Sequence, residues 1–508
     1  MTALKTSNLC TLIKSNLLVF VLLGAQMTHG STLKILMTKD SSSPYSEYSS
    51  GDILAAFNKA VLGQLLTAKD TFELQPDLLK SWKWDSTDNS YELFLRENLT
   101  FHDGSPVKAE DLEFTLLRGF FSKQTSFYEI YLGNILGVDK IKPGTKFVSG
   151  LVKGVQITGP YSVKILLKSP NPSFLYSLAT PFFSFVKKTA LNDDLLTWKK
   201  WPVGAGPYMI IDETPEKISL SKRQGLNSLN NSGPEKIELY KQDSPKVNFD
   251  VSYYPNSNTP SIYKSDEASA IYTLFFTNQN ELSKYKDFRQ AISFGIDRDE
   301  LIKNDNLSIP TSSFLTSAHW KIDKEDKLYD LEKAKYYFLK IPLQLREKKW
   351  KIAVFSVGAL TEEKKHVTNR LADQFAKFGF KVEFFASNEK FLSKQTATDC
   401  PLKFSGRVSD NIDPLLMFAS FKSNSAYRYD NAQNDLKFDK LYEEAAKAVG
   451  TAARVDTLKK LSKYTIDNNF MIPLYENLEA YYYNPNSVMS FGEQSNSLTL
   501  AIEQIHLK

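Results

Sequence analysis

The feature that most constrains the fold is a strand–helix–strand pattern in residues 351–385. An apolar run at 351–355 predicts a strand, and the periodicity of 361–378 predicts an amphipathic helix. Four apolar residues mark that helix at spacings of four, four and three: Val367, Leu371, Phe375 and Phe378. Gly379 ends the helix, and 382–385 is again strand-like. Such a unit implies a parallel strand pair with a right-handed crossover, so we expect an α/β fold.

The rest of the chain repeats this mixture of elements. Residues 91–95 alternate between apolar and polar and predict a half-buried strand, while 51–66, 436–449 and 452–468 predict helices. Two strand-like runs flank the turn at Gly159-Pro160. At roughly 150 residues per domain, 508 residues suggest about three folding units.

Charge and cysteine content exclude several functions. The 63 Lys and Arg against 58 Asp and Glu give a formal net charge of +5, too small an excess over this surface to predict nucleic-acid binding. Two Cys and five His exclude a multi-cysteine metal site and a disulfide framework. Nucleotide-binding, serine-hydrolase and zinc-protease motifs are absent, so we predict no catalytic residue, no cofactor and no metal site.

The first thirty residues predict a secretory signal peptide. Lys5 and Lys14 precede an apolar run at 17–25, and cleavage is expected after Gly30. The run is shorter than the ~20 residues that a membrane-spanning helix needs, although an N-terminal membrane anchor is the alternative. Cys10 precedes the run and is therefore not placed like a lipoprotein cysteine. We expect a periplasmic, monomeric mature chain with no membrane span.

Four stretches carry a resemblance to a known family. Residues 82–112 combine an aromatic-rich strand with Phe-His-Asp-Gly-Ser-Pro-Val-Lys-Ala-Glu-Asp-Leu, and 201–208 read Trp-Pro-Val-Gly-Ala-Gly-Pro-Tyr. Residues 288–301 and 472–475 follow in the same order as in that family. Together these stretches resemble the family 5 extracellular solute-binding proteins, the oligopeptide- and dipeptide-binding components of ABC importers.

This resemblance implies a two-lobed periplasmic binding protein of type II, with an additional subdomain inserted in the first lobe. Three segments would form lobe I: residues 31–64, 198–272 and 485–508. Residues 65–197 would form the insert and 273–484 would form lobe II.

The resemblance also implies a ligand loop at 406–414, where Asp410 matches the aspartate that pairs with the α-ammonium group of a peptide. A carboxylate there would replace the water that the ammonium loses. A surface aspartate is the alternative, and Asp413 before Pro414 predicts a helix cap. Arg407 stands where the family often has an aromatic residue, which would favour acidic or carboxylate-bearing ligands.

Two weaker candidates complete the expected ligand site. Tyr272, Phe275 and Phe276 lie on a strand whose backbone would meet an extended peptide, and an ordinary buried strand is the alternative. Arg428 would supply a cation for the ligand's carboxylate, with a solvated loop as its alternative.

The expected function is capture of short peptides between two lobes and their delivery to ABC transporter permease subunits, without any enzymatic step. Hinge closure on the ligand would signal the loaded state. The same fold binding a nickel chelate, haem, a sugar, or a modified peptide such as a murein peptide or glutathione is the main alternative. An exported hydrolase and a chaperone-like or adhesive role remain further alternatives.

Overall fold

The computed structural model describes most of the chain that follows the predicted signal peptide. The described residues are 31–37, 45, 52–69, 73–123, 126–224, 233–244, 246–277, 279–319, 329–356, 358–389, 393–408, 411–423, 434–494 and 499–508. Within these ranges, no helix is both long and apolar enough to cross a membrane.

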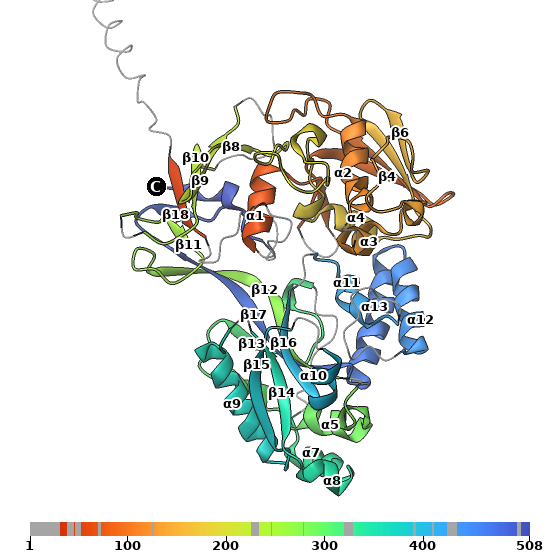
Figure 1. Cartoon of the computed structure of the whole chain (residues 1–508), viewed down its shortest axis with the longest axis vertical. Coiled ribbons are helices and arrows are strands. Elements are labelled where there is room, and N and C mark those ends of the chain that lie inside the picture. Colours follow the sequence, from red (N-terminus) through yellow and green to blue (C-terminus); the bar gives the residue numbers. More distant parts are fainter. Residues whose placement is uncertain are drawn as a thin grey trace, which may run out of the picture.

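Two lobes are stacked along the long axis of the molecule and are joined by two long antiparallel strands (Figure 1). We call the part built from residues 31–260 and 484–508 the upper lobe and the part built from 277–470 the lower lobe. The joining strands are β12 (Ser261–Phe276) and β17 (Met471–Tyr483). Their register is interrupted between Lys264 and Ala268, which indicates a bulge where the strands pass between the lobes.

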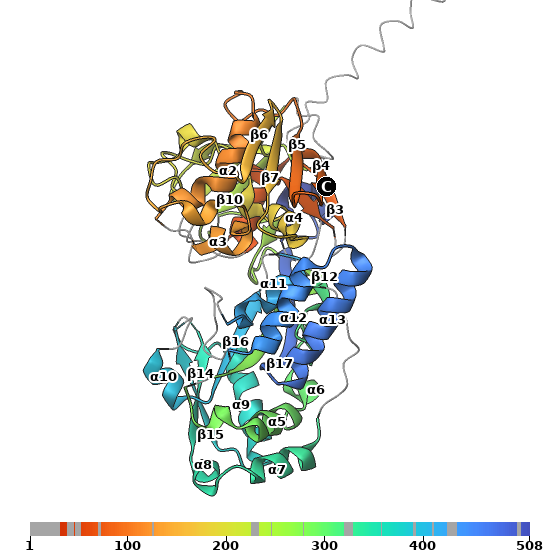
Figure 2. The same ribbon diagram turned by 90° about the vertical axis from the view of Figure 1, so that its right-hand side faces the viewer.

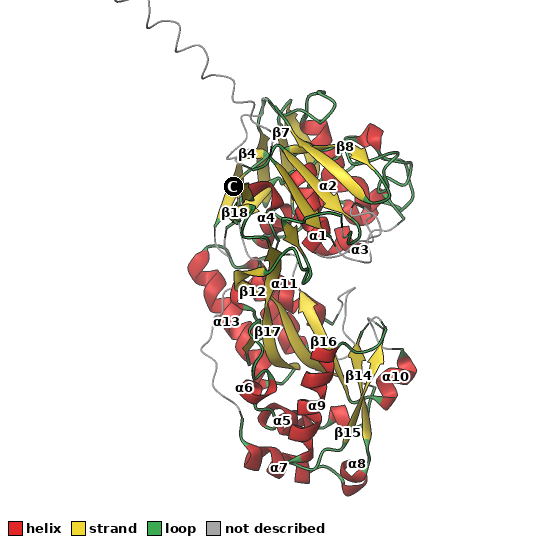
Figure 3. Cartoon of the chain, turned by 90° about the vertical axis from the view of Figure 1, so that its left-hand side faces the viewer, coloured by secondary structure: helices red, strands yellow, loops and turns green. Residues whose placement is uncertain are grey.

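One sheet runs through both lobes because β12 and β17 belong to its centre. Its strand order is β15-β14-β16-β12-β17-β11-β1-β10-β9-β8, with β13 also paired to β17. Helices and strands are mixed in both lobes (Figure 3), which confirms the predicted α/β class. Each lobe also has an apolar core of its own, and Ala318 and Ile412 of the lower lobe pack with the core of the upper lobe.

The lower lobe contains the predicted strand–helix–strand unit. It consists of β14 (Trp350–Phe355), α9 (Glu362–Ala376) and β15 (Val382–Ser387), and the two strands are parallel, as predicted. The Thr361 side chain accepts from the backbone of Lys364 and caps α9. After α9 the chain turns through a left-handed Gly379, with φ +94°. This unit of the lower lobe therefore follows from local sequence signals.

The upper lobe carries a separate four-stranded sheet in order β4-β5-β7-β6, which we call the insert together with α2, α3 and α4. Two signature stretches meet beside it, since the His102 amide donates to the Gly204 carbonyl at 3.0 Å. The His102–Asp103 pair belongs to a turn at Gly104, with φ +82°, so turn geometry accounts for this part of the motif. The helix predicted at 51–66 is shorter than expected, because the chain turns at Gly63 and forms a strand.

The other helices and strands have the following bounds. In the upper lobe they are β1 (Thr32–Leu36), α1 (Asp52–Val61), β2 (Leu66–Ala68), β3 (Leu74–Pro76), β4 (Leu79–Asp85), β5 (Ser90–Leu95), α2 (Ala109–Phe121), α3 (Ser126–Leu132), β6 (Val155–Gly159), β7 (Ser162–Leu166), α4 (Ser173–Leu178), β8 (Tyr208–Glu213), β9 (Lys217–Lys222), β10 (Lys236–Tyr240), β11 (Val251–Ser252), β18 (Val488–Ser490) and β19 (His506–Leu507). In the lower lobe they are α5 (Lys286–Phe294), α6 (Arg298–Leu301), β13 (Ser308–Pro310), α7 (Leu331–Leu339), α8 (Leu343–Glu347), α10 (Lys394–Asp399), β16 (Leu402–Val408), α11 (Pro414–Phe418), α12 (Leu436–Lys447) and α13 (Thr451–Asp467).

Candidate ligand-binding site

The candidate site is built around the connection between β16 and α11, which we call the β16–α11 corner and define as residues 407–418. Asp413 caps α11, because its Oδ1 accepts the Leu415 amide at 3.0 Å and Pro414 occupies the first helical turn. This confirms the predicted cap. In Figure 1 the corner lies where the lower lobe faces the insert.

Arg407 links the end of β16 to α11 and the residues that follow it. Its Nη2 donates to the Met417 carbonyl at 2.9 Å and to the Ser420 hydroxyl at 3.1 Å. Its guanidinium also lies over the rings of Phe314 and Phe421, 5.3 and 5.7 Å from their centroids. These contacts tie Arg407 to α11 and its supporting core, so its expected effect on ligand charge stays a prediction.

The three aromatic residues predicted to line the ligand site, Tyr272, Phe275 and Phe276, lie inside the lower lobe. Phe275 and Phe276 are 4% and 2% exposed and pack into two different apolar cores. Tyr272 stacks on Tyr475 with ring centroids 4.8 Å apart, and burial raises its pKa to about 12. The two phenylalanine side chains therefore serve packing.

The backbone of β12 at these residues is already hydrogen-bonded to neighbouring strands on both edges. Residues 270–276 of β12 pair with β16 on one edge and with β17 on the other, as at Tyr272 against Gly406 and Tyr475. The expected pairing of this strand with a peptide backbone is therefore wrong, because a strand has only two hydrogen-bonding edges. Gly406 lets the Tyr272 ring lie close, since a Cβ there would come within 3.1 Å of the ring.

The remaining two predicted residues, Asp410 and Arg428, lie outside the described residues. Their contacts with a ligand stay predictions. The described neighbours of Asp410 are Val408, at the end of β16, and Asn411, which is 2% exposed.

Three residues at the corner were not identified from the sequence: His319, Asn411 and Arg454. His319 is completely buried; its Nδ1 is 2.6 Å from the Thr316 hydroxyl and its Nε2 is 3.0 Å from the Asn411 carbonyl. Burial lowers the pKa of His319 to about 4, so the ring is neutral near pH 7. A lone histidine 92 residues from its partner carries no sequence signal for this contact.

Arg454 of α13 forms an ion pair with Asp413 at the corner. The two side chains are 6% and 0% exposed, so the pair is withdrawn from water. Among the described residues, Asp413 Oδ2 and Arg454 Nε and Nη1 have no hydrogen-bond partner. The two opposite charges therefore balance each other, while three of their polar atoms make no hydrogen bond within the described residues.

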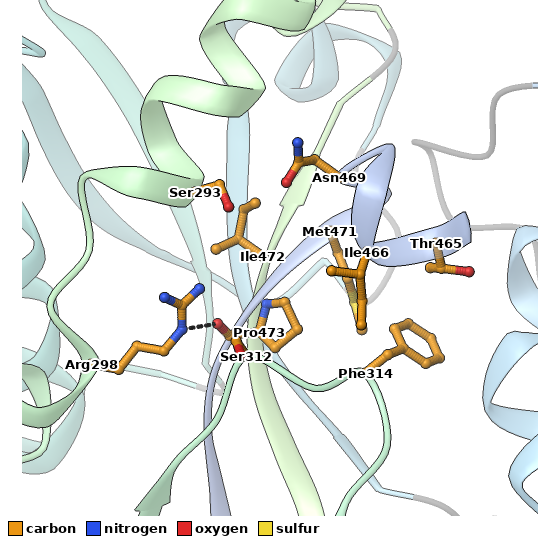
Figure 4. Close-up of a pocket in the computed structure, with 10 residues that line it drawn as sticks. All are labelled: Ser293, Arg298, Ser312, Phe314, Thr465, Ile466, Asn469, Met471, Ile472 and Pro473. Carbon is orange, nitrogen blue, oxygen red and sulfur yellow. Dashed lines mark hydrogen bonds between the residues drawn. The ribbon is translucent and has the colours of Figure 1, made fainter. Parts of the chain in front are cut away.

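Two cavities lie elsewhere in the described structure. One of about 260 Å³ lies against the bulge of β12, with the C-terminal segment on its other side. Its lining includes Lys69, Tyr263, Asp266, Glu267, Glu479 and Gln494. The other, of about 10 Å³, lies behind β17, where Arg298 Nε donates to the Pro473 carbonyl at 2.8 Å (Figure 4). The second cavity has room for about one water molecule, so it is no site for a larger solute.

Several curated proteins are similar to most of the chain. The chain is 22% identical over 478 residues to the probable ABC transporter periplasmic-binding protein SapA of Escherichia coli, covering 84% of each chain. It is 20% identical over 424 residues to the oligopeptide-binding protein OppA of Bacillus subtilis, covering 76% of each. These relatives span most of their own length in the match, so the similarity is not confined to one motif.

Solved structures share the fold. The substrate-binding protein CtaP of Listeria monocytogenes superposes with a TM-score of 0.74 at 19% identity, covering 94% of this chain and 99% of that one. The murein tripeptide binding protein MppA of Escherichia coli superposes at 0.72 and 17% identity, covering 94% and 99%. The nickel–histidine-binding NikZ of Campylobacter jejuni superposes at 0.69 and 19% identity, covering 93% and 97%.

The family model for the bacterial extracellular solute-binding proteins, family 5, matches residues 73–238 and 227–429. This match covers well over half of the chain and includes the insert, the joining strand β12 and the β16–α11 corner. The chain therefore belongs to the bacterial extracellular solute-binding proteins, family 5.

Proposed function

We propose that the protein binds short peptides between its two lobes in the periplasm and delivers them to the permease of an ABC transporter. The observation that carries this proposal is the pair of lobes joined by β12 and β17, in a chain of this family. Two joining strands leave the lobes one hinge to move about, and a solute that contacts both lobes stabilises their closed arrangement.

Recognition of the peptide amine is assigned to Asp410. The supporting geometry is that of the described residues near it in the chain: Arg407 holds α11, Asp413 caps that helix, and His319 Nε2 donates to the Asn411 carbonyl. Because the described residues that flank position 410 are already held in place, a ligand has less conformational freedom to remove from them on binding, which raises affinity. An α-ammonium buried against Asp410 would then recover the hydrogen bonds that it loses from water.

Peptide length and side-chain preference do not follow from the fold. Similar proteins include binders of oligopeptides, a murein tripeptide and a nickel–histidine complex. We therefore propose short peptides with a free amino group as the solute class, because an acidic residue at position 410 suits an ammonium group.

Calorimetric titration with trialanine and with N-acetyl-trialanine tests this proposal. The wild type should bind trialanine more tightly, and Asp410→Ala should weaken trialanine binding roughly tenfold to a hundredfold while hardly changing the acetylated peptide. Asp373→Ala, an exposed position on α9, is the matched control and should leave both affinities unchanged. Equal losses for the two peptides would refute the assignment of Asp410.

The same titration separates the solute classes. Nickel–histidine, haem and a murein tripeptide should bind more weakly than trialanine. Tight binding of one of these with no binding of trialanine would replace the proposed peptide class, while leaving the two-lobed capture mechanism in place. Export is tested by deleting residues 1–30, which should retain the protein in the cytoplasm.

A further inference from the structure

The two lobes touch at a second place besides the joining strands. Helix α13 of the lower lobe lies below α3 and α4 of the insert in Figure 1, and α11 and α13 both lie on the side of the lower lobe that faces the insert in Figure 2. The guanidinium of Arg454, on α13, lies over the ring of Tyr176, on α4, at 5.3 Å from its centroid. The cation of one lobe therefore meets an aromatic face of the other.

Apolar residues extend this contact. Ile412 of the β16–α11 corner and Ala318 beside His319 belong to the lower lobe, yet both pack with the apolar core of the upper lobe. They are 3% exposed each. A second insert ring is close by, because the Arg454 charge opposes the rise that burial causes in the pKa of Tyr91. The lobes thus meet through apolar residues and one buried cation.

We propose that Arg454 is an inter-lobe latch: held by Asp413 in the lower lobe, it binds the face of Tyr176 when the lobes touch and releases it when they separate. The inference rests on the proposed function, because it assigns this contact to the hinge movement of a solute-binding protein.

Two opposing effects make the contact suitable as a latch. The ion pair lies wholly within the lower lobe, so it persists when the lobes separate and water can then reach Asp413 Oδ2 and Arg454 Nε and Nη1. Hydration of these atoms favours separation. The cation–π contact and the burial of Ile412 favour contact. Because the two effects oppose each other, a solute bound between the lobes has to add only a modest free energy to shift the balance.

The latch predicts that the aromatic face of Tyr176 matters and its hydroxyl does not. Tyr176→Leu should lower the ratio of touching to separated lobes by a factor of about 5 to 30, the size expected for loss of a partly desolvated cation–π contact. Tyr176→Phe, which keeps the ring, should leave that ratio close to the wild-type value. This pair of variants separates the latch from a general packing role at the same position.

Distances between spin labels, measured by pulsed electron resonance without added solute, give the ratio directly. Lys153→Cys in the insert and Lys377→Cys on the lower lobe are exposed labelling positions. The native Cys400 is 1% exposed and burial raises the pKa of its thiol to about 11, so it should not react; Cys10 is removed as Cys10→Ser. Longer distances in Tyr176→Leu with an unchanged distribution in Tyr176→Phe are the expected result.

Two results would overturn the latch: identical distances in Tyr176→Leu and the wild type, or equal shifts in Tyr176→Leu and Tyr176→Phe. If Tyr176→Leu does not fold, Arg454→Gln approaches the contact from the other lobe and should give the same lengthening; unchanged distances there would equally refute the latch. Adding trialanine afterwards tests the proposed function separately. A wild type that ignores the peptide but shows the Tyr176 effect would keep the latch and refute peptide capture.

Discussion

The buried pair of Asp413 and Arg454 gives the sharpest prediction of stability. Arg454→Met removes the guanidinium and leaves the Asp413 carboxylate at 0% exposure without its ion-pair partner. Breaking a buried ion pair from one side typically costs about 3–5 kcal/mol, because the remaining charge has lost both water and partner. We therefore expect Arg454→Met to lower the free energy of unfolding at pH 7 by roughly that amount.

A double variant tests the cause. Asp413→Asn combined with Arg454→Met removes both charges, while the Asn oxygen can still accept the Leu415 amide and cap α11. The double variant should therefore be more stable than Arg454→Met alone, by about 1 kcal/mol or more.

Urea unfolding followed by circular dichroism provides the measurement, with a control on the same helix. Lys460 pairs with Asp456 on α13, but these side chains are 59% and 61% exposed. Lys460→Met should change the free energy of unfolding by less than about 1 kcal/mol. A loss below 1 kcal/mol for Arg454→Met, similar to the control, would refute the argument that this ion pair is shielded from water.

Three further predictions concern the framework and its dependence on pH. Gly206→Ala should lower the free energy of unfolding in urea by about 1–3 kcal/mol or more, because its Cβ would lie 2.6 Å from backbone atoms of Val61. Gly159→Ala should cost less, because its Cβ would meet only the Ser162 hydroxyl, which can rotate away. Equal losses for the two variants would contradict this reasoning. Burial lowers the pKa of His319 from 6.5 to about 4, so the stability that it contributes is present above pH 6.5 and lost as the pH falls toward 4. His319→Gln should therefore make the melting temperature depend less on pH between 4 and 6.5, and an unchanged dependence would count against this reasoning. Burial raises the pKa of Asp77 from 3.8 to about 6, so its contribution to stability is greatest below pH 3.8 and is lost as the pH rises through 6. Asp77→Asn should therefore raise the melting temperature at pH 7, and a lower melting temperature would contradict this assignment.

Local patterns in the sequence determined much of the fold. The strand–helix–strand unit follows from a helical period that ends at Gly379, and the structure has α9 between two parallel strands accordingly. The cap at Asp413 and the turn at Gly104 involve residues within four positions of each other. Such features depend on backbone geometry and neighbouring side chains, and these are properties of a short segment. The predicted lobe and insert boundaries stay predictions.

The tertiary structure alone decided which side chains gather at the candidate site. The run from Tyr272 to Phe276 has large apolar side chains on both faces, so its sequence does not distinguish a strand that lines a ligand site from a strand in the core. In the structure this run pairs with a strand on each edge and lies in the core. Arg454 is 41 residues from Asp413 and far from Tyr176 in the chain, and no local pattern indicates either contact. Contacts of this kind arise only when separately formed helices and strands pack, because side-chain pairing across lobes depends on distances that the sequence does not contain.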